Sequence, residues 1–183
     1  MRRAEAAVAA VASGALLATT VVAGAASATA EEHSPRQKAL AEVRQATARY
    51  HDIDQAVGFG ELRDAAGIAC IDNAAGGMGV HFVNGSRIDG VLDPARPEAL
   101  VYEPQADGSM KLGAVEYVIF DSAWTGEDPP ELFGHAFHYM PGQDEAKPNR
   151  YGLPAFWELH AWVWDPNPNG MFADWNPEVT CPL

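Results

Sequence analysis

Cysteine is scarce in this sequence, and the compact motifs of several common enzyme classes are missing. Only two cysteines occur among the 183 residues, Cys70 and Cys181, and neither belongs to a Cys-x-x-Cys pair. A thiolate zinc site is therefore disfavoured, because such sites use closely spaced cysteines. The Gly-x-Ser-x-Gly motif of serine hydrolases and the His-Glu-x-x-His motif of zinc peptidases do not occur either. Any functional site has to be assembled from residues that lie far apart in the sequence.

Basic residues are also few, which disfavours some classes of binding partner. The chain has 12 Lys and Arg against 25 Asp and Glu, a formal net charge of −13. Residues 1–30 contain Arg2, Arg3 and Glu5, so without them the counts are 10 and 24 and the net charge is −14. A surface this negative repels phosphate backbones and anionic lipid headgroups. We expect metal ions or small molecules as partners, and no nucleic acid.

Long, strongly apolar runs are lacking, and residues 1–30 have the pattern of a secretory signal peptide. Two arginines precede an apolar stretch that ends near Ala23, and small residues follow. A membrane anchor is the alternative; it is disfavoured because the stretch is rich in alanine and shorter than the ~20 strongly apolar residues of a span. We predict cleavage after Ala28 or Ala30, a secreted protein, and no membrane insertion afterwards.

The remaining residues, 31–183, are predicted to form a single globular domain. Their number is typical of one domain with its own core. An isolated pair of cysteines in an oxidising compartment is most simply one disulfide, Cys70–Cys181. It would close a loop of about 110 residues and stabilise the domain by roughly 2–4 kcal/mol.

The hydrophobic pattern predicts an α+β fold. Ser34-Pro35 is typical of a helix start, and apolar residues then recur at helical spacing up to Tyr50, with an extension or a restart through Asp52 to Val57 left open. Four extended segments follow, at residues 80–83, 99–103, 112–120 and 156–164. Residues 121–155 hold many prolines and glycines and are predicted to be one long loop insertion. We therefore expect an amino-terminal helix or helices and then a curved or barrel-like antiparallel sheet.

The register of the central hairpin follows from its turn. Asp107-Gly108 is a strong turn signal, and counting outward from it pairs Val101 with Ala114 and Ala99 with Glu116. This pairing places Glu103 and Glu116 on one face of the hairpin. In the last strand, alternation places Glu158, His160, Trp162 and Trp164 on one side.

Three predicted strands each carry an ionisable side chain among small or apolar neighbours: His81, Glu116 and His160. Such groups are costly to bury on a sheet face unless they are paired or bound to something. If the three faces coincide, two imidazoles and a carboxylate converge, which resembles a two-histidine, one-carboxylate site for zinc, iron or copper. The alternative is that the histidines are ordinary core or surface residues and that the glutamate faces water.

Further residues are candidates for the surroundings of this site. They are expected to orient a ligand, to replace one, or to line a small-ligand pocket on the concave sheet face. They are Glu103, Glu158 and Trp162 on the strands, and His135 and His138 in the long loop. For the two loop histidines, anchoring of the loop by its aromatic residues is the other interpretation.

Several runs of the sequence resemble a family of secreted microbial proteins without an assigned function. The resemblance covers about residues 50–181. It depends on the runs Gly76 to Asn84, Pro97-Glu98, Tyr102-Glu103-Pro104, Val115-Glu116-Tyr117, Leu132-Phe133-Gly134, Leu159 to Trp164, Asn167 to Phe172 and Trp175-Asn176-Pro177. It implies export and a shared site around His81, Glu116 and His160. Since that family has no known activity, it implies no reaction.

The sequence thus predicts a secreted protein of unspecified activity with a site for a divalent metal or a small ligand. In an enzymatic version, His81 and His160 hold the metal, Glu116 is a ligand or a base, and bound water is the nucleophile. The hypothesis from another functional class is a non-catalytic binding or structural protein of the cell envelope or extracellular space, without a metal.

Overall fold

The fold is described from a computed structural model that covers residues 34–60, 70–142 and 153–181. The predicted signal peptide and its cleavage sites lie outside these residues. All of the described residues belong to one structural unit. None of the described helices is both long and apolar enough to cross a membrane.

The helical part begins where the sequence predicts it. Helix α1 (Pro35–Thr47) starts after Ser34, whose hydroxyl accepts a hydrogen bond from the backbone N–H of Gln37. The Gln37 side chain in turn accepts from the backbone N–H of Ser34, which completes a capping box. A 3₁₀ turn (Ala48–His51) and the short helix α2 (Ile53–Val57) follow. Of the two alternatives for residues 52–57, the restarted helix is therefore the one present.

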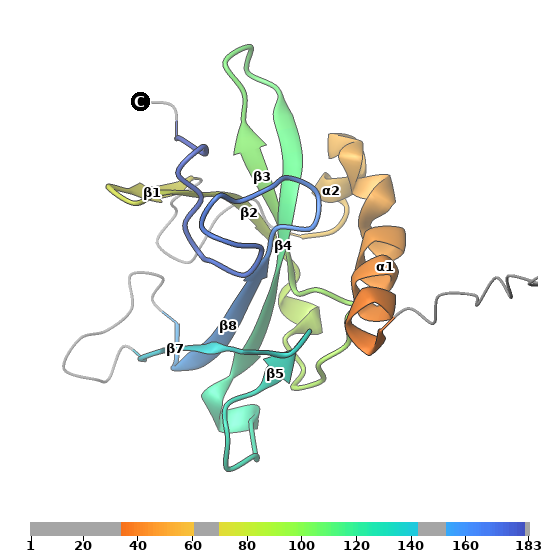
Figure 1. Ribbon diagram of the computed structural model, residues 1–183, viewed down its shortest axis with the longest axis vertical. Coiled ribbons are helices and arrows are strands. Elements are labelled where there is room, and N and C mark those ends of the chain that lie inside the picture. The colour runs from red at the N-terminus through yellow and green to blue at the C-terminus, as the bar shows by residue number, and fades with distance from the viewer. Residues whose placement is uncertain (1–33, 61–69, 143–152, 182–183) are drawn as a thin grey trace, which may run out of the picture. The chain divides into compact units, whose positions relative to one another are not determined.

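A strongly curled, six-stranded antiparallel sheet follows the helices, so the predicted α+β fold is confirmed (Figure 1). Its strand order is β1-β2-β3-β4-β8-β7. The strands are β1 (Ile71–Asn73), β2 (Gly76–Val83), β3 (Ala99–Pro104), β4 (Met110–Phe120), β8 (Phe156–Ala161) and β7 (His138–Met140). Strand β2 starts four residues before the predicted segment, because its glycines belong to the strand and pair with β1.

The predicted pairing of the central hairpin is confirmed around Glu116. Val101 pairs with Ala114 and Ala99 with Glu116. Closer to the turn the register shifts by one residue, since Tyr102 pairs with Leu112 and Gly113 has no partner on β3. Gly113 is thus the extra residue of a β-bulge.

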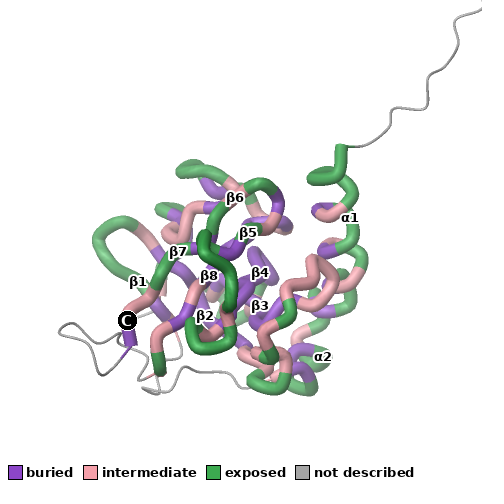
Figure 2. The backbone as a smooth tube through the Cα atoms, turned by 90° about the horizontal axis from the view of Figure 1, so that it is seen from below, coloured by how far each residue is buried: buried purple, intermediate pink, exposed green. Residues whose placement is uncertain are grey.

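Different parts of the chain pack against the two faces of the sheet. The main hydrophobic core lies on the face that packs against the helices, where Leu40 and Val43 of α1 meet Leu100, Val115 and other residues of the sheet (Figure 2). On the other face, Val101 and Ala114 pack against Trp162 and Val179 of the carboxyl-terminal segment. The carboxyl-terminal segment therefore covers the face opposite the helices.

The last strand is shorter than predicted, which corrects the position of Trp164. The segment expected to run to residue 164 ends at Ala161, because the backbone N–H of Trp162 donates to Met171 and that of Trp164 to Gly113. Trp164 therefore does not share the face of His160. Its indole N–H donates to the Thr47 hydroxyl of α1 at 3.1 Å.

The predicted loop insertion, residues 121–155, contains more regular structure than expected in its described part, residues 121–142 and 153–155; residues 143–152 lie outside the described residues. The short strands β5 (Glu131–Leu132) and β6 (His135–Ala136) pair with each other. Strand β7 joins the edge of the main sheet, where His138 pairs with Glu158. Proline and glycine signals mark such a segment as irregular, but pairing at a free sheet edge is decided by the strand that it meets.

The disulfide Cys70–Cys181 is present. It joins the start of β1 to the end of the carboxyl-terminal segment, across a sequence separation of 111. Nearby, Gly77 and Asn176 exchange backbone hydrogen bonds at 3.0 Å. Gly76 permits this contact, because it has a φ of +127° and a Cβ there would lie 2.2 Å from the Asn176 carbonyl oxygen.

Candidate metal centre

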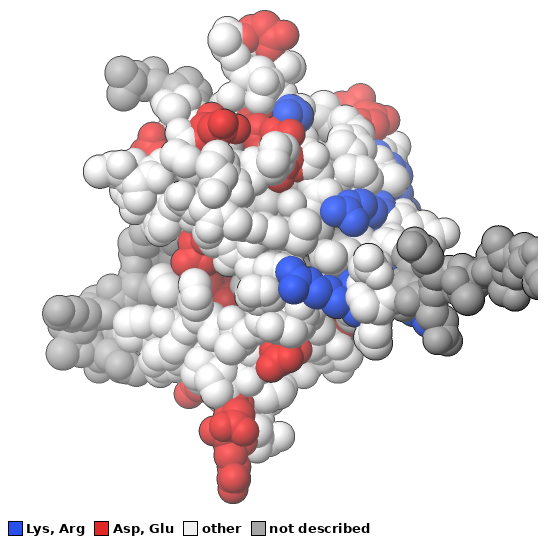
Figure 3. All heavy atoms as spheres, in the orientation of Figure 1, with Lys and Arg blue, Asp and Glu red and all other residues white. Residues whose placement is uncertain are grey.

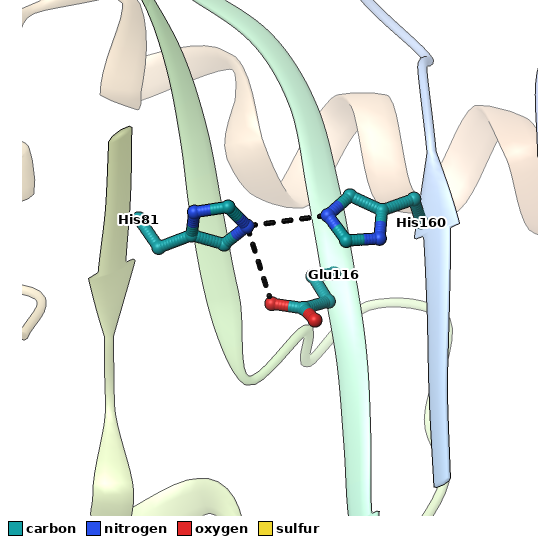
Figure 4. A group of neighbouring side chains, drawn as sticks. All are labelled: His81, Glu116 and His160. Atoms are coloured by element: carbon teal, nitrogen blue, oxygen red, sulfur yellow. Dashed lines mark hydrogen bonds and ion pairs between the residues drawn. The ribbon is translucent and has the colours of Figure 1, made fainter. Parts of the chain in front are cut away.

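Strands β2, β4 and β8 bring His81, Glu116 and His160 together (Figure 4). Glu116 pairs directly with His160 across β4 and β8. His81 pairs with Val101 on β3, whose neighbour Ala99, two residues away on the same face, pairs with Glu116. Because side chains alternate along each strand, all three lie on the face opposite the helices. The register therefore places them in adjoining rows of one face.

The curl of the sheet allows His81 and His160 to touch. Three strand spacings of a flat sheet would separate β2 from β8 by roughly 14 Å. Yet the two Nε2 atoms are only 3.2 Å apart, with the rings nearly perpendicular at 86°. This face is therefore the inner side of the curl.

The distances between the polar atoms are those of ligands around one ion. His81 Nε2 lies 3.2 Å from His160 Nε2 and 3.6 Å from Glu116 Oε2. Two nitrogens bound tetrahedrally to zinc at 2.0–2.1 Å are separated by about 3.3 Å. One ligand atom from each of the three residues lies within 4.8 Å of the others. The cluster can thus hold a metal ion, and without one the two imidazoles can share a hydrogen bond.

The site is buried, and burial decides its protonation. His160 is fully buried, and this desolvation, with the charge of His81, holds the pKa of His160 well below its usual range. Burial also raises the pKa of Glu116 well above that of an ordinary glutamate, and the charge of Glu158 and a hydrogen bond to it act in the same direction. Both shifts favour the neutral form of the group when no ion is bound.

Glu158 and Asp174 form a second cluster around His160. One ligand atom each from Glu158, His160 and Asp174 lies within 4.8 Å of the others. Burial raises the pKa of Glu158 to about 7, although its hydrogen bond to Glu116 acts against this rise. His160 Nδ1 lies 3.9 Å from Asp174 Oδ1. His138 lies beside Asp174. Together with His138, the five residues of the two clusters form one continuous group of six titratable side chains.

Of the surrounding residues that the sequence singles out, Glu158, His138 and Trp162 lie beside these clusters. His138 Nδ1 lies 2.9 Å from Asp174 Oδ2. Trp162 is buried, and its indole N–H donates to the carbonyl oxygen of Ala173, next to Asp174. Trp162 therefore holds the segment that carries Asp174.

Glu103 and His135 belong to neither cluster among the described residues. The Glu103 carboxyl group lies against Gly113, and its polar neighbours are Asp165 and Lys111. Burial raises its pKa to about 7, and a hydrogen bond to Asp165 adds to the rise. The shared face with Glu116 thus does not bring the two carboxyl groups into one site. His135 packs against Phe172 instead, with ring centroids 4.1 Å apart.

Sequence reasoning missed Asp174 and Glu98. Asp174 follows the last predicted strand, in a segment without periodicity, so only its position between the apolar Ala173 and Trp175 sets it apart. Glu98 precedes β3 and is almost fully buried, with Oε2 accepting a hydrogen bond from the backbone N–H of Val118 at 3.0 Å. Burial raises the pKa of Glu98 to about 8.

The donor set defines the chemistry that this centre can support. Two imidazole nitrogens and one carboxylate oxygen suit zinc, iron(II) or copper(II), whereas calcium and magnesium prefer oxygen ligands alone. Three protein ligands leave a coordination position for water or a small molecule.

Comparisons of the whole chain with protein-family models, with curated proteins and with solved structures find no match, so the resemblance to a secreted microbial family stays a prediction.

Proposed function

We propose that this is a secreted metal-binding protein whose His81, Glu116 and His160 side chains hold one divalent transition-metal ion. The observation that carries the proposal is the convergence of two Nε2 atoms and a carboxylate oxygen, from three different strands, on one buried point. The disulfide is consistent with an extracellular protein, and the signal-peptide pattern of residues 1–30 supports export.

A bound ion explains why these three polar side chains are buried together. All three have less than a tenth of their surface exposed. Burying polar groups costs free energy unless strong interactions compensate for the lost water. Coordination supplies such an interaction for both imidazoles and the carboxylate at once. Glu158, hydrogen-bonded to Glu116, would orient that ligand as carboxylates near metal sites commonly do.

The chemistry that follows is activation of a water molecule or of a small ligand. A zinc ion with three protein ligands binds water in its fourth position and lowers the pKa of that water toward neutrality. Because the ligand side chains are buried, the centre suits a small molecule better than a polymer. The proposal therefore specifies a metal and its bound water, and assigns no substrate.

The second candidate function is a non-catalytic exported protein in which the cluster contains no metal. One observation favours it: burial shifts the pKa of Glu116 upward and that of His160 downward, so both shifts favour neutral side chains in the metal-free cluster. In that case the two imidazoles and the Glu116 and Glu158 carboxyl groups stabilise the sheet through hydrogen bonds to one another.

Elemental analysis of the exported protein, purified without chelator, decides between the two. We expect at least one equivalent of zinc, copper or iron per chain. Removing the ion with a chelator is expected to lower the thermal midpoint, and adding zinc back should restore it. Binding at a hundred times the dissociation constant stabilises the folded state by about 2.7 kcal/mol.

Two variants serve as a matched pair for this experiment. Glu116→Gln keeps the size of the side chain but removes the anionic ligand, and is expected to lose the metal while remaining folded. Glu127→Gln removes an equal charge at an exposed position and should retain it. A metal-free wild-type protein whose thermal midpoint does not respond to zinc, copper or iron would refute the proposed function.

A further inference from the structure

The imidazole of His160 has polar surroundings on both sides. Its Nε2 atom faces His81, whereas its Nδ1 atom faces Asp174 (Figure 4 shows the first side). His160 is fully buried, and its Nδ1 atom makes no hydrogen bond within the described part of the chain. A buried ring nitrogen without a hydrogen bond is uncommon, because its desolvation is then uncompensated.

Asp174 presents a matching atom to this nitrogen. Its Oδ1 atom is also buried without a hydrogen-bond partner among the described residues. The 3.9 Å between the two atoms is too long for a hydrogen bond. Two ligands bound tetrahedrally to zinc at 2.0–2.2 Å are about 3.4 Å apart, so an approach of roughly half an ångström would bring both atoms onto one ion. The carboxyl group of Glu158 completes a set of three ligand atoms within 4.8 Å.

The surroundings of Asp174 are also those of a metal ligand. His138 Nδ1 lies 2.9 Å from the other carboxylate oxygen, Oδ2, and so fixes the orientation of Oδ1. The carbonyl oxygen of the preceding residue, Ala173, accepts hydrogen bonds from the side chains of Trp162 and Asn167. Carboxylate ligands are commonly held by such outer contacts.

We propose that Glu158, Asp174 and His160 Nδ1 form a second cation position, so that His160 bridges two divalent metal ions. This inference rests on the proposed function, which supplies the first ion. When both ring nitrogens bind metal, His160 would release its N–H proton to solvent and bridge as an imidazolate, and the carboxyl groups would release the protons they carry and bind as carboxylates. Two divalent ions then balance three carboxylates and one imidazolate, and the buried centre as a whole is neutral, as a low-dielectric site requires.

A copper titration of the metal-free protein tests this proposal. Copper(II) alone is added, loosely bound ions are removed by gel filtration, and bound copper is compared with the integrated electron paramagnetic resonance signal. We expect two copper ions per chain and a signal much smaller than this content, because an imidazolate bridge couples the two spins.

Asp174→Asn is the test variant, because it removes a charged ligand of the second position only. It is expected to bind one copper ion per chain with full signal intensity. His138→Ala is expected to weaken binding of the second ion by 10–100-fold and to leave the first unchanged. Glu127→Gln controls for copper on the acidic surface and should behave as the wild type. If Asp174→Asn does not fold, the wild-type signal and the variant His138→Ala, which removes the hydrogen bond to Asp174, provide the comparison.

The outcomes separate this inference from the proposed function. One copper ion per chain, unchanged in Asp174→Asn, overturns the second position and leaves the first standing. Two ions with an uncoupled signal, or two ions still bound by Asp174→Asn, also overturn the bridge. No bound copper in the wild type would overturn the proposed function itself.

Discussion

Glu98 shows how burial of one side chain makes stability depend on pH. It is 1% exposed, and its carboxyl group accepts the backbone N–H of Val118. Burial disfavours the charged form and raises the pKa of Glu98 from 4.5 to about 8. Between these two values the folded protein keeps a proton that the unfolded chain releases, so its stability falls as the pH rises.

Glu98→Gln is expected to remove this part of the pH dependence. Glutamine keeps the acceptor for Val118 and cannot ionise. At pH 5 the wild type and the variant should be about equally stable, and at pH 9 the variant should be more stable by on the order of 3 kcal/mol. Urea unfolding in the presence of a chelator measures this difference. A variant that follows the wild type over the whole range, as exposed Glu127→Gln should, would contradict the assignment.

The candidate metal ligands differ in how well single residues could be identified from the sequence. Their residue types and strand positions were visible in the sequence, because a histidine or glutamate among apolar neighbours stands out. Asp174 was not visible, since its segment has no periodicity and its role depends on a contact across the fold. A sequence pattern therefore finds ligands on strands and misses those on irregular segments.

At the scale of elements, the bulge at Gly113 sets the register of the β3–β4 hairpin. The turn is one residue longer than predicted, because the backbone N–H of Gln105 donates to Ser109 around a loop with Gly108 at a φ of +85°. The bulge at Gly113 restores the predicted register beyond it. Glu116 thus meets Ala99 as expected, although the turn itself differs.

Gly113→Ala is expected to destabilise the hairpin. A Cβ at this position would lie 2.3 Å from Glu103 Oε1 and 3.0 Å from its Cδ. We expect a loss of roughly 1–3 kcal/mol in the free energy of unfolding, typical of overpacking. The loss should be smaller when Glu103 is also replaced by alanine.

Gly85→Ala is the control for this prediction, since a Cβ there has no atom within 4 Å. Urea unfolding of the single and double variants gives the coupling energy. Equal losses from Gly113→Ala with and without the Glu103 side chain would show that the backbone of the bulge, rather than the contact, is responsible.

At the scale of the whole molecule, charge and the disulfide are the dominant features. Acidic side chains are spread over the face shown in Figure 3, and basic side chains gather mainly beside α1. Helix α1 contains Arg36, Lys38 and Arg44. The acidic surface fits a protein that attracts cations, which is the class of ligand that we propose.

Reduction of Cys70–Cys181 is expected to destabilise the whole domain. The bond joins β1 to the end of the segment that covers the inner face of the sheet, and it closes a loop with a separation of 111 residues. In the chain-entropy description, a loop of about 100 residues contributes about 4.7 kcal/mol, and measured losses are about 2–5 kcal/mol. Thermal unfolding with and without reductant, and of a variant with both cysteines replaced by serine, measures the loss. An unchanged midpoint would show that packing alone holds the segment.

Local structure and the types of ligand follow from the amino-acid order alone. The capping residues fix the start of α1, alternation fixes which faces His81, Glu116 and His160 occupy, and the number of cysteines fixes their pairing. These features depend on neighbours in the chain or on simple counting, so they can be inferred without coordinates.

Which of these groups meet depends on the folded chain as a whole. The curl of the sheet brings β2 and β8 close enough for two imidazoles to touch, whereas Glu103 remains apart although it shares their face. The end of β8 at Ala161 turns Trp164 toward α1, and the fold of the last residues places Asp174 beside His160. Curvature and long-range contacts arise from the packing of all the elements together, and no local pattern encodes them.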